Sequence, residues 1–204
     1  ISVYEYLDTV TQQNLLSLLR SGEMQEVMEE MSPDDRARLF EELPAKVVRQ
    51  LLDQLSPEER KVTAELLGYE AETAGRLMTT EYIALKENQT ALEALDIVRR
   101  RARDTETIYS LYVTDNERRL TGILSLRDLV TADPHTLIRD VMTEEVLSVR
   151  TNTDQEKVAR TIQRYDFLAV PVVDLEQRLV GIVTVDDVID VIEQEATRDL
   201  YAAG

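Results

Sequence analysis

One segment of this chain occurs twice, and it limits the possible folds more than any other feature. Residues 121–130, Thr-Gly-Ile-Leu-Ser-Leu-Arg-Asp-Leu-Val, return as residues 180–189, Val-Gly-Ile-Val-Thr-Val-Asp-Asp-Val-Ile. Each copy has the pattern of an apolar strand, a hydroxyl residue and an acid that opens a helix. The two glycines, Gly122 and Gly181, lie 59 residues apart. The chain therefore contains a tandem supersecondary unit of roughly 60 residues, the kind of repeat that decides the interpretation of the whole fold.

A second, shorter segment upstream also repeats. Leu77-Met78-Thr79 returns as Val141-Met142-Thr143, 64 residues later. After it, each copy predicts an extended run, a helix, a strand, a turn, a second strand and a second helix. In the first copy we expect the extended run at 83–85, the helix at 90–101 and the next strand at 110–113. In the second copy we expect the same elements at 147–149, 153–165 and 168–173. This β-α-β-β-α order leaves one sheet face of each unit bare, so we expect the two units to pack on each other.

The first 70 residues have helical patterning only. Apolar residues recur at helical spacing, as in the leucines of residues 15–19. Two helix-start signals, Ser32-Pro33-Asp34-Asp35 and Ser56-Pro57-Glu58-Glu59, combine an N-cap serine with an acid three residues later, which resembles a capping box. They predict a small stack of helical hairpins. Capping is the simplest role for these acids, and a binding role for Asp34 or Asp35 would need a facing partner.

The composition excludes several classes of protein. The net charge of −17 argues against nucleic acid as a partner and against an anionic membrane surface, and it favours cations or a positively charged partner. The chain has no cysteine, so it has no disulfide and no thiolate metal site. No apolar stretch approaches the roughly 20 residues of a transmembrane helix. We therefore expect a soluble piece of a longer protein.

Residues for catalysis are scarce. The single histidine, His135, follows Pro134 between the two repeats, where an exposed linker position is expected. With one histidine and no cysteine, the chain has few of the residues that catalytic triads and zinc sites require. We therefore expect that this chain is not an enzyme.

The hydroxyl and acid of each repeat carry a resemblance to a known family. Gly122-x-x-Ser125-x-x-Asp128 and Gly181-x-x-Thr184-x-x-Asp187 resemble a tandem pair of CBS domains, the modules named after cystathionine beta-synthase. In such pairs the hydroxyl and carboxylate often hold the phosphate and ribose of an adenine nucleotide, chemistry that suits these groups. The resemblance makes ATP a possible ligand, with candidate residues Ser125, Arg127, Asp128, Phe167 and Thr184. Phe167 fits a core position slightly better, and Asp187 fits both this set and the metal set below.

Two further stretches, residues 69–82 and 183–193, look like parts of the MgtE family of magnesium channels. That resemblance implies an α+β protein in which a helical N-domain precedes the CBS pair and a membrane channel, absent from this chain, follows it. It implies a helical-hairpin N-domain at 1–70, a first CBS domain at 71–137 and a second CBS domain at 138–204, which includes the start of an acidic connecting helix.

Carboxylates dominate the C-terminal helix, and on residue types alone they are also typical of a solvated helix face. Mg²⁺ takes oxygen ligands and keeps several waters, so loosely clustered acids suit it better than they suit Ca²⁺. The resemblance implies regulatory Mg²⁺ at domain and dimer interfaces. The matching positions are Asp34, Asp154, Glu156, Asp166, Asp187, Glu195 and Asp199. Arg38 and Arg198 stand where further acids would help, so one site or its stoichiometry can differ here.

The resemblance therefore implies a Mg²⁺-sensing regulatory region on the cytoplasmic side of the cell membrane. Its CBS pair is expected to form a homodimer through its helices, and its other partner is the channel domain of the same full-length chain. Mg²⁺ bridging acidic interfaces would close the pore. Two alternatives remain open: an adenine-nucleotide-sensing CBS module attached to an enzyme, and a helical scaffold for a protein partner.

Overall fold

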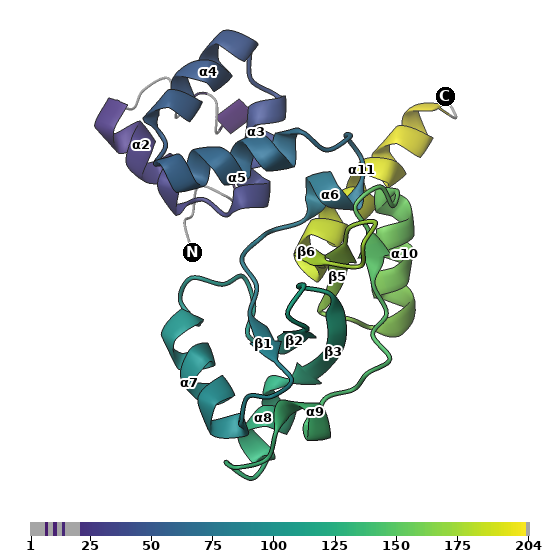
Figure 1. The fold of residues 1–204 in the computed structure, drawn as a ribbon. Coiled ribbons are helices and arrows are strands. Elements are labelled where there is room, and N and C mark those ends of the chain that lie inside the picture. Colours follow the sequence, from purple (N-terminus) through teal and green to yellow (C-terminus); the bar gives the residue numbers. More distant parts are fainter. Residues whose placement is uncertain (1–6, 8–9, 12–13, 15–20, 203–204) are drawn as a thin grey trace. The chain divides into compact units, whose positions relative to one another are not determined.

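The computed structural model describes residues 7, 10–11, 14 and 21–202, and for residues 21 and 194–202 it describes the backbone alone (Figure 1). The chain divides into two compact units, residues 1–70 and residues 71–204. Each unit has a hydrophobic core of its own.

The first unit is helical, as the sequence predicts. Its described helices are α2 (Ser21–Glu30), α3 (Pro33–Glu41), α4 (Ala45–Gln54) and α5 (Pro57–Leu67). Proline stands at the first position of α3 and α5, where it costs no helical hydrogen bond. The core is formed by Met28, Met31, Leu39, Phe40, Leu51 and Leu55. Most of the leucine run at 15–19 lies outside the described residues.

The two expected capping boxes differ in the structure. Ser56 accepts a hydrogen bond from the backbone N of Glu59 at 3.3 Å, as a capping serine does. Ser32 makes no such bond, and its hydroxyl instead donates to Asp35 Oδ2 at 3.1 Å. The expected capping box is therefore absent at Ser32. At Ser56 only the serine half of the box forms, because the Glu59 carboxylate pairs with Arg36 and the backbone N of Ser56 donates to Glu29 Oε1 at 2.9 Å.

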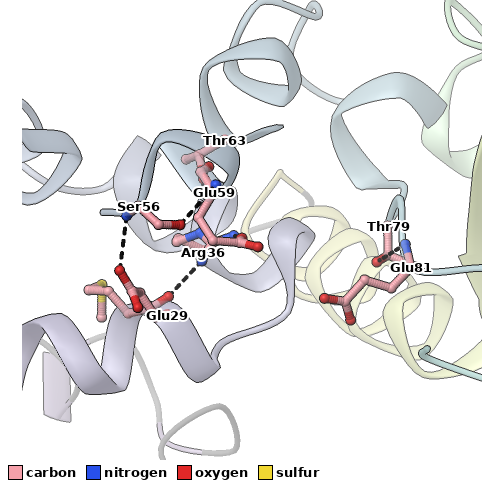
Figure 2. Close-up of polar contacts among 8 residues, drawn as sticks. Glu29, Arg36, Ser56, Glu59, Thr63, Thr79 and Glu81 are labelled. Atoms are coloured by element: carbon pink, nitrogen blue, oxygen red, sulfur yellow. Dashed lines mark hydrogen bonds and ion pairs between the residues drawn. The ribbon is translucent and has the colours of Figure 1, made fainter. Parts of the chain in front are cut away.

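A fully buried arginine ties three of these helices together (Figure 2). Arg36 donates from Nε to Thr63 Oγ1 at 2.9 Å and from Nη1 to the carbonyl of Met28 at 2.7 Å. Its remaining nitrogen pairs with the Glu59 carboxylate. These bonds satisfy a charge whose burial would otherwise be costly. Arg36 is not among the residues singled out from the sequence. The available signal was its position inside the helix that is predicted to start at Pro33.

The second unit contains two similar repeats, each with a three-stranded sheet and its helices. The first repeat comprises β1 (Ala84–Lys86), α7 (Ala91–Arg101), β2 (Ser110–Thr114), β3 (Leu120–Ser125) and α8 (Leu126–Thr131). The second repeat comprises β4 (Val149–Arg150), α10 (Gln155–Tyr165), β5 (Ala169–Val173), β6 (Leu179–Thr184) and α11 (Val185–Ala202). In each sheet the first strand runs parallel to the middle strand, and the third runs antiparallel to it. The β-α-β-β-α order is as predicted.

The two sheets pack on each other, which confirms the expected burial of their bare faces. Tyr112, Ala169, Leu179 and Ile182 form the core between the sheets. The β2–β3 and β5–β6 turns also join, because Leu120 N donates to Gln177 O at 3.1 Å and Leu179 N donates to Arg118 O at 2.9 Å. The outer face of the first sheet is covered by apolar residues of α7 and α8, among others.

Two short segments are exchanged between the repeats. The junction segment (residues 71–79), which contains α6 (Ala74–Leu77), lies on the second repeat. The linker segment (residues 134–143), which contains α9 (Ile138–Val141), lies on the first. Each places a methionine over a glycine: a Cβ at Gly181 would lie 2.5 Å from Met78 Sδ, and one at Gly122 would lie 2.4 Å from Met142 Sδ. This close packing explains why the Met-Thr and glycine segments repeat together in the sequence.

Candidate functional site

The hydroxyl–carboxylate pair of the first repeat is accessible and caps a helix. Ser125 precedes α8, and its hydroxyl donates to Asp128 Oδ2 at 2.6 Å while it accepts from the backbone N of Asp128 at 3.1 Å. Asp128 is exposed and Ser125 is half-buried. Hydrogen bonds from Ser125, with a smaller contribution from the positive charge of exposed Arg127, hold the pKa of Asp128 below its usual value. The site therefore offers an ionised carboxylate beside a helix N-terminus.

The equivalent pair of the second repeat is buried. Thr184 is 5% exposed and Asp187 is 7% exposed, and the hydroxyl of Thr184 bonds to Asp187 Oδ2 at 2.8 Å. The same hydroxyl also contacts the Asp186 carboxylate. Asp186 is one of the acids of the C-terminal helix in the sequence, but it is not among the predicted ligands.

Phe167 lies in the loop between α10 and β5. It is half-buried, and its ring stacks on Tyr165, with centroids 5.5 Å apart and ring planes 19° apart. The guanidinium of Arg164 lies 5.6 Å from the centroid of the Tyr165 ring. Phe167 is therefore neither a fully buried core residue nor an isolated aromatic, and an adenine ring could extend such a stack.

Three of the candidate metal ligands lie in α10 or directly beside it. Asp154 is its N-cap and accepts from the backbone N of Glu156 at 2.9 Å. Glu156 is half-buried and pairs with Arg160 at 2.9 Å. Asp166 ends the helix in the left-handed conformation, with φ 52°. At 1.5 Å per residue, Asp154 and Asp166 lie about 18 Å apart along the helix, so one ion cannot bind both in one chain.

The described part of the chain holds no group of three or more Asp, Glu or His side chains close enough to share a metal. Asp154 and Asp166 are exposed carboxylates, and the oxygen donors they offer are the type that Mg²⁺ prefers. Glu195, Arg198 and Asp199 belong to α11, and the structure describes only their backbone.

Asp34, the candidate in the helical unit, is buried at the start of α3. Its Oδ1 has no hydrogen-bond partner among the described residues. Burial raises the pKa of Asp34 to about 6, and the neighbouring Asp35 carboxylate adds to the rise. Helix capping is the simplest role that the sequence offers for Asp34, whereas the structure buries this carboxylate and leaves one of its oxygens unpaired among the described residues.

Among the described residues, no helix has both the length and the apolar character that crossing a lipid bilayer requires.

Comparison with known proteins agrees with these two units. The family described as the MgtE intracellular N domain matches residues 1–72, and the CBS domain family matches residues 74–135 and 138–194. The magnesium transporter MgtE of Thermus thermophilus is 53% identical over 156 residues, which are 76% of this chain and 35% of that protein. This chain spans about a third of the length of the curated transporters it matches.

Solved structures are similar over nearly the whole chain. The cytosolic domain of the Mg²⁺ channel MgtE in complex with ATP is 48% identical, with a TM-score of 0.88 over 93% of this chain and 77% of that one. The soluble part of a magnesium transporter is 42% identical, with a TM-score of 0.81 over 95% of this chain and 86% of that one. These relatives are transporters, in agreement with the expectation that the chain is not an enzyme. The matches together show that the chain belongs to the MgtE family, and that it carries the family's intracellular N domain followed by its pair of CBS domains.

Proposed function

We propose that this chain is the Mg²⁺-sensing regulatory region of an MgtE-type magnesium transporter, and that it favours pore closure when Mg²⁺ is abundant. The observation that carries the proposal is the similarity to the cytosolic domain of a Mg²⁺ channel over 93% of the chain. The net charge of −17 supports a cation as the ligand, because acids that face each other repel until a cation lies between them.

The positions of the carboxylates support bridging between surfaces over a closed site within one chain. Asp154 and Asp166 are exposed at opposite ends of α10, so each needs oxygen donors from another surface to complete a Mg²⁺ shell. Mg²⁺ would then stabilise the compact arrangement only as far as it binds that arrangement better than the open one. Asp34, Asp187, Glu195 and Asp199 remain candidates for further bridges.

Exposed apolar residues support a homodimer of the CBS pair. Val130 on α8 and Ile189 on α11 occupy equivalent positions, and both are exposed, as are Tyr109 and Leu168 at a second pair of equivalent positions. Large exposed apolar side chains that recur in one arrangement are typical of an association surface. The partner proposed for this surface is a second copy of the chain, and the other partner is the membrane channel of the full-length protein.

Mg²⁺ binding is tested by thermal unfolding. Millimolar MgCl₂ should raise the unfolding temperature well beyond NaCl at matched ionic strength, because a ligand that binds only the folded state stabilises it by mass action. Equal shifts from both salts would mean charge screening and would contradict the sensor proposal.

Bridging is tested by small-angle scattering of the Asp154→Asn, Asp166→Asn double variant. Loss of repulsion should make the Mg²⁺-free form more compact, and loss of ligands should weaken Mg²⁺-driven compaction. Asp187 is less suited to this test, because its bond to buried Thr184 also gives it a structural role. A matched control, Asp133→Asn with Asp140→Asn, removes two exposed charges outside the candidate set. If both double variants behave alike, the assignment to Asp154 and Asp166 is wrong.

A second candidate function is the binding of ATP, supported by the relative solved in complex with ATP. Ser125, Arg127 and Asp128 would hold the phosphates and ribose from the start of α8, with Phe167 and Thr184 as further candidates. Calorimetric titration with ATP in the presence of Mg²⁺ tests it. Wild type should release or absorb heat on binding, and Asp128→Ala should bind less tightly. Absence of a binding signal in wild type would end this hypothesis.

A further inference from the structure

Two methionines occupy equivalent positions in the exchanged segments, and they differ in their contact with solvent. Met78 of the junction segment is 1% exposed, whereas Met142 of the linker segment is half-buried. The residues that follow them differ in the same way, because Thr79 is fully buried and Thr143 is exposed. A reagent dissolved in water can therefore reach the contact of the linker segment with β3 more easily than the contact of the junction segment with β6.

Methionine is the main side chain of this protein that mild oxidants can modify. The chain has no cysteine and five methionines, so no thiol competes for the oxidant. Met28, Met31 and Met78 are buried, whereas Met24 and Met142 are half-buried. Within residues 71–204 the sequence has only Met78 and Met142, so Met142 is the accessible methionine of the CBS pair.

Met142 lies where the linker segment is fastened to the first repeat. Its side chain packs against the apolar core of that repeat, and a Cβ at Gly122 would lie 2.4 Å from its sulfur. Beside it, Thr143 N donates to Ile123 O at 2.8 Å, and Ile123 N donates to Thr143 O at 2.9 Å. These contacts hold the linker segment on β3 two residues before Ser125, which begins the candidate nucleotide site.

We propose that Met142 is an oxidation site for hydroperoxides such as hydrogen peroxide, and that conversion to the sulfoxide releases the linker segment from β3. The sulfur attacks one peroxide oxygen, so that an S–O bond forms and the O–O bond breaks. The other oxygen leaves as hydroxide and takes up a proton to give water. The sulfur thereby loses two electrons, and the peroxide gains them. Methionine sulfoxide reductases reverse the reaction, so the release is reversible.

Release follows from the surroundings of the sulfur. The sulfoxide oxygen is a strong hydrogen-bond acceptor, and burying it without a donor costs free energy. The side chain of Met142 packs on Gly122 and on apolar residues, which offer no side-chain donor. The oxidised side chain is therefore more stable in water than on β3. The effect on the neighbouring Ser125 matters only if the proposed binding of ATP holds, whereas oxidation and release do not depend on it.

The first experiment measures which methionines react. The folded full chain is treated with hydrogen peroxide in EDTA without nucleotide, and peptide mass spectrometry follows the added oxygen over time. Met142 should gain oxygen at least roughly tenfold faster than Met78, because burial keeps the oxidant away from Met78. In concentrated urea the two rates should become equal. Equal rates in the folded chain, or an unreactive Met142 beside an oxidised Met24, would overturn the proposal.

The second experiment measures release by hydrogen–deuterium exchange of the oxidised full chain. A Met24→Leu background removes the other half-buried methionine. Exchange at the Ile123 and Thr143 amides should rise several-fold, because their mutual bonds open, and sulfoxide reductases should restore the original rates. The equivalent amides of the second repeat, Thr79 and Ile182, are the internal control. Unchanged exchange in the oxidised chain, or an equal rise in both pairs, would contradict release of the linker segment.

Two variants test whether Met142 causes the change. Met142→Leu keeps a similar volume without the sulfur, so its exchange should not respond to peroxide. Met142→Gln places a polar group at the same position, so exchange at Ile123 and Thr143 should be raised without peroxide, and it serves as the test where Met142→Leu fails to fold. The same response to peroxide in Met142→Leu, or wild-type exchange in Met142→Gln, would overturn the assignment. Because Mg²⁺ and ATP are both left out, these outcomes are independent of the proposed functions.

Discussion

The two CBS repeats carry a hydroxyl and a carboxylate at equivalent positions, yet the two pairs have different surroundings. Asp128 is exposed and forms a capping box with Ser125, whereas Asp187 is buried with Thr184. The surrounding helices differ as well: α8 has 6 residues, while α11 has 18 and packs against α10. A longer helix with a packed neighbour removes the second pair from water. Repetition of a motif therefore does not imply repetition of its role.

The largest expected difference concerns the glycines of the two repeats. Gly181→Ala should lower the free energy of unfolding by about 3 kcal/mol, and Gly122→Ala by about 1 kcal/mol, because overpacking costs more where the backbone must move. The new methyl group at Gly181 meets the Thr79 carbonyl as well as Met78, whereas the one at Gly122 meets the flexible side chain of Met142. Urea unfolding of the full chain measures both, and equal losses would show that the exchanged segments are equally adaptable.

A smaller difference is expected for the two carboxylates. Asp187→Ala should cost about 2 kcal/mol, because Thr184 loses a buried hydrogen-bond partner, whereas Asp128→Ala should cost about 1 kcal/mol or less, as for an exposed helix cap. Exchange of the β6 and β3 amides reports the stability of each repeat separately. Asp187→Asn, which keeps an acceptor oxygen, serves as the milder control. A greater loss for Asp128→Ala would reverse the comparison.

The smallest effect is a pH dependence from the first pair. The pKa of Asp128 is lowered in the folded state, so its contribution to stability is present above its unfolded pKa and is lost as pH falls through the folded value. Exchange of the α8 amides, corrected for intrinsic rates, should therefore increase below about pH 4. Ser125→Ala should remove this dependence, and an unchanged acid response in that variant would contradict the assigned cause.

Asp34 provides a control of opposite sign in the other unit. Its pKa is raised to about 6, so the protonated form is favoured in the folded state and stability falls as pH rises from its unfolded pKa through 6. In EDTA, exchange of the α3 amides should show this loss between about pH 4 and 6, and Asp34→Asn should abolish it. A flat profile in wild type would mean that the carboxylate finds a partner in solution.

Much of the architecture follows from local patterns. The alternation of apolar residues, the turn at 115–117 and the N-cap residues Thr90 and Ser125 place most helices and strands to within one or two residues. The strand β4 is the clearest deviation, since it covers residues 149–150 instead of 147–149. Its extent is decided by parallel pairing with β5, a contact between residues more than 20 positions apart.

The sequence by itself determined the repeat, its β-α-β-β-α order, the helical N-domain and the family to which these motifs belong, because each depends on spacing within a short stretch of chain. Only the tertiary structure decided which of two similar carboxylates is buried, that Arg36 is held by Met28, Glu59 and Thr63, and that Met78 packs on Gly181 about 100 residues away. These features depend on which surfaces meet after the elements have formed. The burial of a side chain and the exchange of short segments between the two repeats are properties of that packing, so no local pattern encodes them.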